Sequence, residues 1–340
     1  MMDWRKLLSP KRARHRSSAA DEPVRSAFQK DWDRVVFSSA FRRLQDKTQV
    51  HSLPESDYVR TRLTHSMEVS SVGRSLGTAV GQVVLQRQPG LAQHATAADF
   101  GHVVAAACLA HDIGNPPFGH FGEETIRHWF RDIGAPLLTP LSPAERADLA
   151  GFEGNAQGFR ILTRLQNWHD DGGLRLSAAT LATFTKYPRE SLLPVQPGAA
   201  DPGAAKFGIF QDDKEQFAEV AQAVGLLRKS NSAAYWCRHP LAFLVEAADD
   251  ICYRVVDLED GYKLGRLDFA QVEQLLLALV GRAPVRYRDI AEPPRRVAYL
   301  RAKAIGRLSD DVVEVFLAAE PSILAGELQA DLLSATADRK

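Results

Sequence analysis

The sequence predicts a mainly α fold with few or no strands. Apolar residues recur at spacings of three and four over several long stretches, which is the period of an amphipathic helix. Alternation of apolar and polar residues is rare, and no Asn-Gly or Asp-Gly pair joins two β-branched runs, so hairpin signals are weak. The chain has 340 residues, of which 45% are hydrophobic, so it is long enough for a large core in one or two domains.

The predicted helices begin after a basic N-terminal stretch. Residues 1–24 hold six Lys or Arg among the first sixteen positions, and we expect them to form a flexible, solvated arm; the alternative is an arm that contacts phosphates or a neighbouring subunit. Apolar spacing from Phe28 to Leu44 predicts helical structure, and another helix is expected from near Thr64. Residues 97–110 are rich in alanine, as in a helix that is buried on most sides.

Proline and glycine divide the rest of the chain. Residues 114–117 (GNPP) should end the preceding helix, because proline lacks an N–H donor and restricts the residue before it. Residues 134–143 and 193–205 are expected to be loops. Helical spacing returns in three regions, which are residues 159–165, 241–257 and 297–319. We expect the arm to be followed by a core over residues 25–265 and a helical C-terminal extension over residues 266–340.

The composition is that of an ordinary globular protein. The chain has 42 basic and 42 acidic residues, so a zero formal net charge removes the simplest argument for nucleic-acid binding. Three scattered cysteines do not form a disulfide framework and favour a reducing compartment. No apolar run approaches the ~18 residues that a membrane span needs, and no secretory signal is evident, so we expect a cytoplasmic protein with no membrane partner.

Histidines and carboxylates occur in a pattern typical of a metal site. His111 and Asp112 are adjacent at the expected end of a helix, and His65 lies in another helix. Asp249 and Asp250 come late in a third helix that is otherwise apolar, where an unpaired carboxylate would cost several kcal/mol. An isolated His-Asp pair would be weak evidence, but these residues together favour a metal centre, with Asp250 as the alternative to Asp249.

The order of His65, His111-Asp112 and Asp249 resembles the metal-binding pattern of the HD-domain superfamily of phosphohydrolases. Further segments resemble the bacterial dGTP triphosphohydrolase (dGTPase) family. They are residues 41–50 (FRRLQDKTQV), 60–66 (RTRLTHS), 111–120 (HDIGNPPFGH) and 152–157 (FEGNAQ). The resemblance covers roughly residues 25–260 and implies an HD-domain helical fold around a single metal site.

The resemblance also implies an activity. Members of this family hydrolyse a deoxynucleoside triphosphate, dGTP or another dNTP, to the deoxynucleoside and tripolyphosphate. The implied metal ligands are His65, His111, Asp112 and Asp249. Two imidazoles and two carboxylates with open coordination positions suit one divalent ion, Mn²⁺ or Mg²⁺ with Co²⁺ or Fe²⁺ as further candidates, better than a closed zinc site.

The catalytic residues implied are His120 and Glu123. They lie three positions apart on an expected first helical turn, so the carboxylate can orient the imidazole. By the resemblance, His120 would transfer the proton at the scissile 5′ oxygen or activate the attacking water. The substrate-binding residues implied are Gln49, Val50, Arg62, Lys186, Tyr187, Tyr253 and Asp257. Structural roles are the alternatives for Lys186 and for Tyr253.

Gln49 and Val50 would line the base and sugar, Arg62 and Lys186 would lie near the phosphates, and Tyr253 with Asp257 would face the sugar. Family members usually continue well beyond the position of residue 340, so we expect the C-terminal extension to be short relative to theirs. The resemblance also implies a homo-oligomer, a hexamer in this family. Two alternatives remain: another HD-domain nucleotidase or phosphodiesterase, and a catalytically impaired regulator that binds nucleotides or single-stranded DNA.

Overall fold

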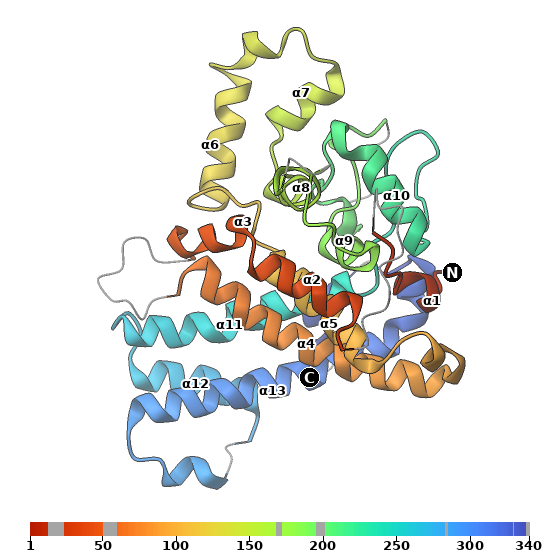
Figure 1. Cartoon of the computed structure of the whole chain (residues 1–340). Coiled ribbons are helices and arrows are strands. Elements are labelled where there is room, and N and C mark those ends of the chain that lie inside the picture. Colours follow the sequence, from red (N-terminus) through yellow and green to blue (C-terminus); the bar gives the residue numbers. More distant parts are fainter. Residues whose placement is uncertain are drawn as a thin grey trace.

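A computed structural model confirms the mainly α fold (Figure 1). It describes residues 1–12, 24–49, 60–167, 172–194, 201–282, 285–328 and 330–337. Over these ranges the backbone forms no extended strand, and β pairing is limited to isolated bridges such as that between Arg12 and Ser177.

The centre of the fold is a pair of helices that pack along their length, α4 (Arg62–Arg87) and α5 (Ala97–Ala110) (Figure 1). They approach closely because α4 presents glycine to α5: a Cβ on Gly77 would lie 2.7 Å from the carbonyl oxygen of Phe100. Helices α2 (Ala27–Val36) and α9 (Ala178–Phe184) pack on α5, and α11 (Ala242–Lys263) packs on α4. This arrangement brings together the start of α4, the end of α5 and the interior of α11.

The other helices surround this centre. Helix α6 (His120–Arg131) and helix α7 (Pro143–Ala150) extend together from one side, at the top of Figure 1. The C-terminal helices pack on α4 and α11 from the other side. The remaining α-helices are α1 (Trp4–Leu7), α3 (Ser39–Arg42), α8 (Gly154–Arg160), α10 (Lys214–Val224), α12 (Phe269–Val280), α13 (Pro293–Ala325) and α14 (Leu332–Ala337). Short helical turns are η1 (Arg43–Asp46), η2 (Pro89–Gln93), η3 (Ala135–Leu138), η4 (Ile161–Leu165), η5 (Pro202–Ala204), η6 (Gln211–Asp213) and η7 (Val285–Asp289).

The predicted helix boundaries are close to those observed. Residues 97–110 form α5 with the expected bounds, and α4 begins at Arg62 because Thr61 caps it and exchanges hydrogen bonds with Thr64. Helix α11 runs past the predicted end at residue 257 to Lys263. No described helix combines the length and the apolar character that crossing a bilayer requires.

The first twelve residues differ from the flexible arm that we expected. Trp4 is 1% exposed, its Nε1 donates to Glu320 at 2.9 Å, and the amide of Met2 donates to the carbonyl of Leu324 at 2.7 Å. The short α1 is amphipathic, with Trp4 and Leu7 facing the core while its basic residues face solvent. The basic residues therefore indicated the exposure of their own side chains and not that of the whole segment. The rest of the expected arm, residues 13–23, lies outside the described residues.

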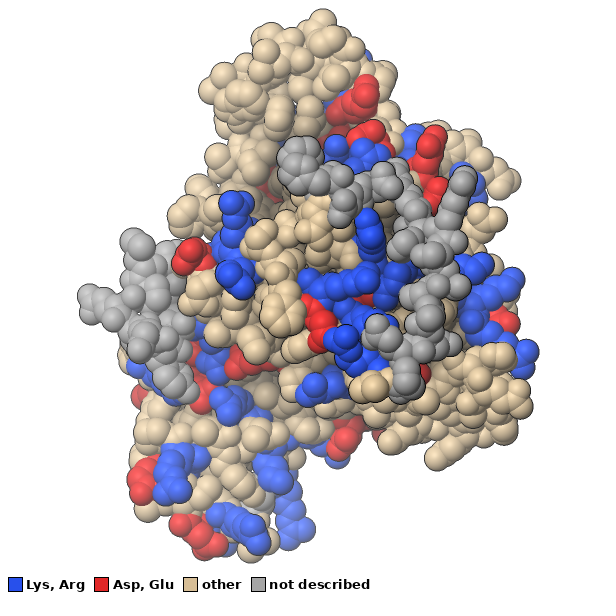
Figure 2. Space-filling view, viewed as in Figure 1, with Lys and Arg blue, Asp and Glu red and all other residues tan. Residues whose placement is uncertain are grey.

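Basic side chains are not confined to the N-terminal stretch. Figure 2 shows Lys and Arg gathered across the middle of one face, with Asp and Glu interspersed among them. Basic residues also form ion pairs in the interior: Arg12 contacts the fully buried Asp31 at 2.6 Å.

Candidate metal centre and active-site cleft

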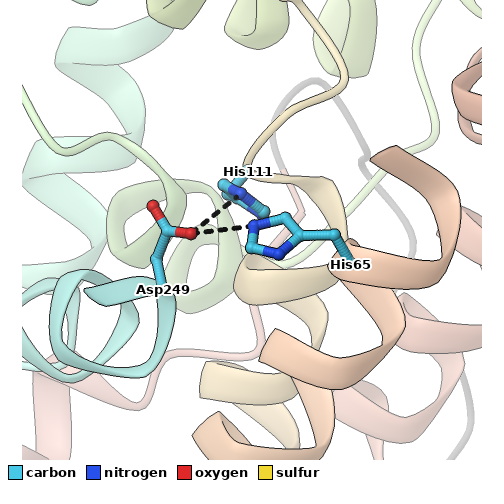
Figure 3. A group of neighbouring side chains, drawn as sticks. All are labelled: His65, His111 and Asp249. Atoms are coloured by element: carbon cyan, nitrogen blue, oxygen red, sulfur yellow. Dashed lines mark hydrogen bonds and ion pairs between the residues drawn. The ribbon is translucent and has the colours of Figure 1, made fainter. Parts of the chain in front are cut away.

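Three of the predicted metal ligands converge where α4, α5 and α11 meet. His65 lies in the first turn of α4, His111 follows the last residue of α5, and Asp249 comes from α11 (Figure 3). One ligand atom from each lies within 4.8 Å of the others. Asp249 Oδ1 is 2.9 Å from Nε2 of His65 and 3.6 Å from Nε2 of His111. Two imidazoles and one carboxylate form a donor set that suits a divalent cation.

Hydrogen bonding and charge prepare these donors. His111 Nδ1 bonds to the carbonyl of Cys108 at 2.7 Å, which turns Nε2 toward Asp249. Burial would raise the pKa of Asp249, but His111 and His65 hold it well below its usual range. Burial likewise opposes the charged form of His65, and the hydrogen bond to Asp249 raises its pKa nevertheless. The carboxylate is therefore ionised and oriented toward both rings.

Asp112, the fourth predicted ligand, lies beside this group without joining it. Its Oδ2 accepts from Arg62 Nη1 at 2.6 Å, and its Oδ1 accepts from the side-chain amide of Asn115 and lies 3.6 Å from His111 Nε2. Asp250, the alternative to Asp249, is not part of the converging group. Burial raises the pKa of Asp250 to about 6.

A cleft of about 390 Å³ opens beside this group, and His111 and Asp249 line it. Most of the predicted substrate-binding residues line it, namely Gln49, Arg62, Lys186, Tyr187 and Tyr253. Asp257 lies one helical turn beyond Tyr253 on α11 and does not line the cleft, and burial raises its pKa to about 6. Val50 lies outside the described residues. Gln49 Oε1 and Arg62 Nε are buried and find no hydrogen-bond partner in the described part of the chain, as expected of groups that await a ligand.

The predicted His120–Glu123 pair is present at the start of α6. His120 is the first residue of the helix, and its side chain is 86% exposed at the edge of the cleft. Its Nδ1 lies 3.0 Å from Oε2 of Glu123, which is 2% exposed. Burial alone would raise the pKa of Glu123, but the hydrogen bonds from His120 and from the amide of Gly154, the latter at 2.7 Å, lower it. An exposed imidazole thus rests on a buried, ionised carboxylate.

Comparisons with known proteins identify the family of the chain. A family model described as "HD domain" matches residues 62–148, a range that includes His65 and His111. The chain is 51% identical to a deoxyguanosinetriphosphate triphosphohydrolase-like protein of Synechocystis, over 98% of this chain and 76% of the relative. The chain belongs to this family of HD-domain phosphohydrolases. A protein of the same name from Pseudomonas aeruginosa is 45% identical over 98% of this chain and 74% of its own length. The deoxyguanosinetriphosphate triphosphohydrolase of Klebsiella pneumoniae is 32% identical over 99% and 72% respectively.

Within this HD-domain framework, the cleft also contains charged residues that sequence reasoning missed. Glu246 pairs with Lys186 at 3.0 Å and with Arg238 at 2.6 Å, and it lies three positions before Asp249 on α11. A spacing of three residues places Glu246 on the same face of the helix as Asp249, so the sequence alone could have pointed to Glu246. Burial would lower the pKa of Lys186, but Glu246 raises it, so the ammonium stays charged. Lys206 lines the cleft from a loop, where no periodicity pointed to it.

Proposed function

We propose that this chain hydrolyses deoxynucleoside triphosphates to the deoxynucleoside and tripolyphosphate, in a reaction that depends on one divalent metal ion. The observation that carries the proposal is the convergence of His65, His111 and Asp249 beside a cleft that His111, Asp249 and His120 line. The names of the relatives support dGTP as one candidate among the dNTPs.

The metal would be held by the three converging residues, and Asp112 would join as a fourth ligand if Arg62 moved onto substrate. Nitrogen and carboxylate oxygen donors with an open side favour Mn²⁺ or Mg²⁺, and Co²⁺ or Fe²⁺ also fit. When bound, such an ion supplies Lewis-acid polarisation of a phosphoryl oxygen. The hydrogen bond from His111 to Cys108 and the ion pair of Asp112 keep the ligands oriented before it binds.

His120 would move the proton. In the proposed reaction, water attacks the α-phosphorus, the bond from that phosphorus to the 5′ oxygen breaks, and the 5′ oxygen ends as a hydroxyl. Glu123 occupies Nδ1 of His120, so Nε2 is left to give a proton to the 5′ oxygen or to take one from the attacking water. The exposed position of His120 at the edge of the cleft suits either transfer.

The other lining residues would bind the nucleotide. Arg62 and Lys186 would contact the phosphates, and both now pair with carboxylates that the phosphates would replace. Gln49 offers an unpartnered carbonyl oxygen toward the base or sugar. Tyr253, which is 51% exposed, would pack against C2′ of a deoxyribose and disfavour a 2′-hydroxyl. Asp257 would reach the 3′-hydroxyl only after a change of rotamer or backbone.

The test is a product analysis. The protein is incubated with each dNTP and with Mn²⁺ or Mg²⁺, and the products are separated by ion-exchange chromatography. We expect one tripolyphosphate for each deoxynucleoside, with no turnover in EDTA or in the Asp249→Asn variant. Release of phosphate or pyrophosphate would overturn the proposal in favour of another HD-domain nucleotidase. Tight binding of dNTP and metal with no turnover would favour a regulator.

A further inference from the structure

A group of four charged residues, with buried carboxylates and partly exposed cations, lies next to His120. It consists of the carboxylates of Glu123 and Glu153 and the cations of Arg127 and Lys206. The residues come from three separate places: α6, the residue before α8, and the loop that follows η5. Only Glu123 was expected from the sequence, and the proposed function assigns no role to the other three.

Each cation contacts both carboxylates. Arg127 Nη2 lies 2.7 Å from Glu153 Oε1 and 3.7 Å from Glu123 Oε2, while its Nε donates to the carbonyl of Phe152 at 2.7 Å. Lys206 Nζ lies 3.4 Å from Glu153 Oε2 and 3.8 Å from Glu123 Oε2. The side chains of the two carboxylates are 8% and 2% exposed, so water does little to screen them.

We propose that Lys206, Glu153 and Arg127 are positioning residues that keep Glu123 ionised and in place, and thereby keep His120 oriented for proton transfer. This proposal rests on the proposed function of His120. The four groups sum to zero charge, two positive and two negative. Loss of one cation would leave two neighbouring buried carboxylates with a single positive partner, a situation that favours protonation of one of them.

The charges facing Glu123 support this reasoning. From its own helix they are His120 and Arg127, and from the segments packed against α6 they are Glu153 and Lys206. Lys206 lowers the pKa of Glu123, while for Glu153 burial raises the pKa above its ordinary value. A protonated Glu123 would no longer accept a charge-assisted hydrogen bond from Nδ1 of His120, so the imidazole would lose its fixed orientation.

The test compares Lys206→Met with Lys214→Met. Lys214 Nζ pairs with Glu190 at 3.3 Å and its side chain is partly exposed like that of Lys206, 39% against 28%, but it does not line the cleft. Glu123 is followed by carboxyl ¹³C NMR as a function of pH, and kcat and KM are measured over the same range. For Lys206→Met we expect the pKa of Glu123 to rise by about one unit, with the acid limb of kcat moving by the same amount. Lys206→Arg should restore both, and Lys214→Met should change neither.

An unchanged Glu123 titration in Lys206→Met would overturn the proposal, even if KM rose, because that combination would mean that Lys206 contacts substrate phosphate instead. The NMR titration needs no turnover. If the unmodified chain forms no tripolyphosphate, the proposed function fails, and the titration of Glu123 still decides whether Lys206 controls its charge.

Discussion

Gly114 lies two positions after Asp112, where the segment after α5 touches α8. A Cβ added at this position would lie 2.1 Å from the carbonyl oxygen of Gly154 and 2.2 Å from the amide nitrogen of Gly158. Both neighbours are backbone atoms, so no side-chain rotation can relieve the contact. The substitution Gly114→Ala therefore tests how tightly the two segments must pack.

The distances set the size of the effect. Ordinary contact begins at 3.4 Å, so the two segments must separate by about 1.3 Å (3.4 minus 2.1). Overpacking of this kind typically costs ~1–3 kcal/mol of the free energy of unfolding. The same shift moves the amide of Gly154, which donates to Glu123 at 2.7 Å, away from the carboxylate. Because misplacement of a catalytic group by ~1 Å can cost ~10²-fold in rate, we expect activity to fall more steeply than stability.

Urea unfolding and dNTP turnover measure the two effects, and Gly306→Ala is the matched control. Gly306 lies inside α13, where an added Cβ would meet nothing within 4 Å, so the same substitution should stabilise the protein by ~0.5–1 kcal/mol. If Gly114→Ala were as stable and as active as Gly306→Ala, the backbone contact would not be as close as described, and the reasoning would be refuted.

Three more predictions concern the core, the pH dependence of folding and the catalytic pair. Trp4→Ala should lower the free energy of unfolding by ~3–5 kcal/mol in urea titrations, since it removes a buried ring and leaves Glu320 without its indole donor; a loss below ~1 kcal/mol would contradict a packed N-terminus. His239 is fully buried with Nε2 against the carbonyl of Leu7, and burial lowers its pKa to about 4. The stability that neutral His239 contributes is therefore complete above the unfolded pKa of 6.5, and it is lost as pH falls from there toward 4, by up to ~3 kcal/mol. The His239→Gln variant should lack this part of the pH dependence of unfolding, and identical curves of stability against pH for the two proteins would count against the prediction. His120→Ala should bind dNTP with little change in affinity but turn over ~10²–10⁴-fold more slowly, so an unchanged kcat would remove His120 from the mechanism.

The helices could be predicted because their signals are local. Apolar spacing predicted a helix from near Thr64, close to the observed start of α4 at Arg62, and the GNPP segment predicted the end of α5 near His111. The convergence of His65, His111 and Asp249 could be anticipated because three motifs, each readable within a few residues, occurred in a known order. Long-range pairing was the part that remained hidden. That Asp112 is held by Arg62, fifty positions earlier, depends on how α4 and α5 pack.

The burial of the N-terminal residues was also hidden from the sequence. Arg5 and Lys6 suggested a solvated segment, and no apolar period contradicted them because a four-residue helix is too short to display one. What decides the burial of Trp4 is a partner 316 positions away, Glu320 on α13. Similarly, no motif distinguishes Lys206 and Glu153 from surface charges. They come into contact only because the two segments that carry them pack beside α6.

The contact between the first residues and α13 has a consequence for biosynthesis. Met2 and Trp4 are the first of these residues to leave the ribosome, yet their partners Leu324 and Glu320 are made last among them. Trp4 also packs against Phe100 of α5, with ring centroids 5.1 Å apart, so part of its packing does not depend on α13, whereas its hydrogen bond to Glu320 does. Closing so long a loop is an entropically costly late step. The first residues therefore cannot complete their native contacts before α13 has been synthesised.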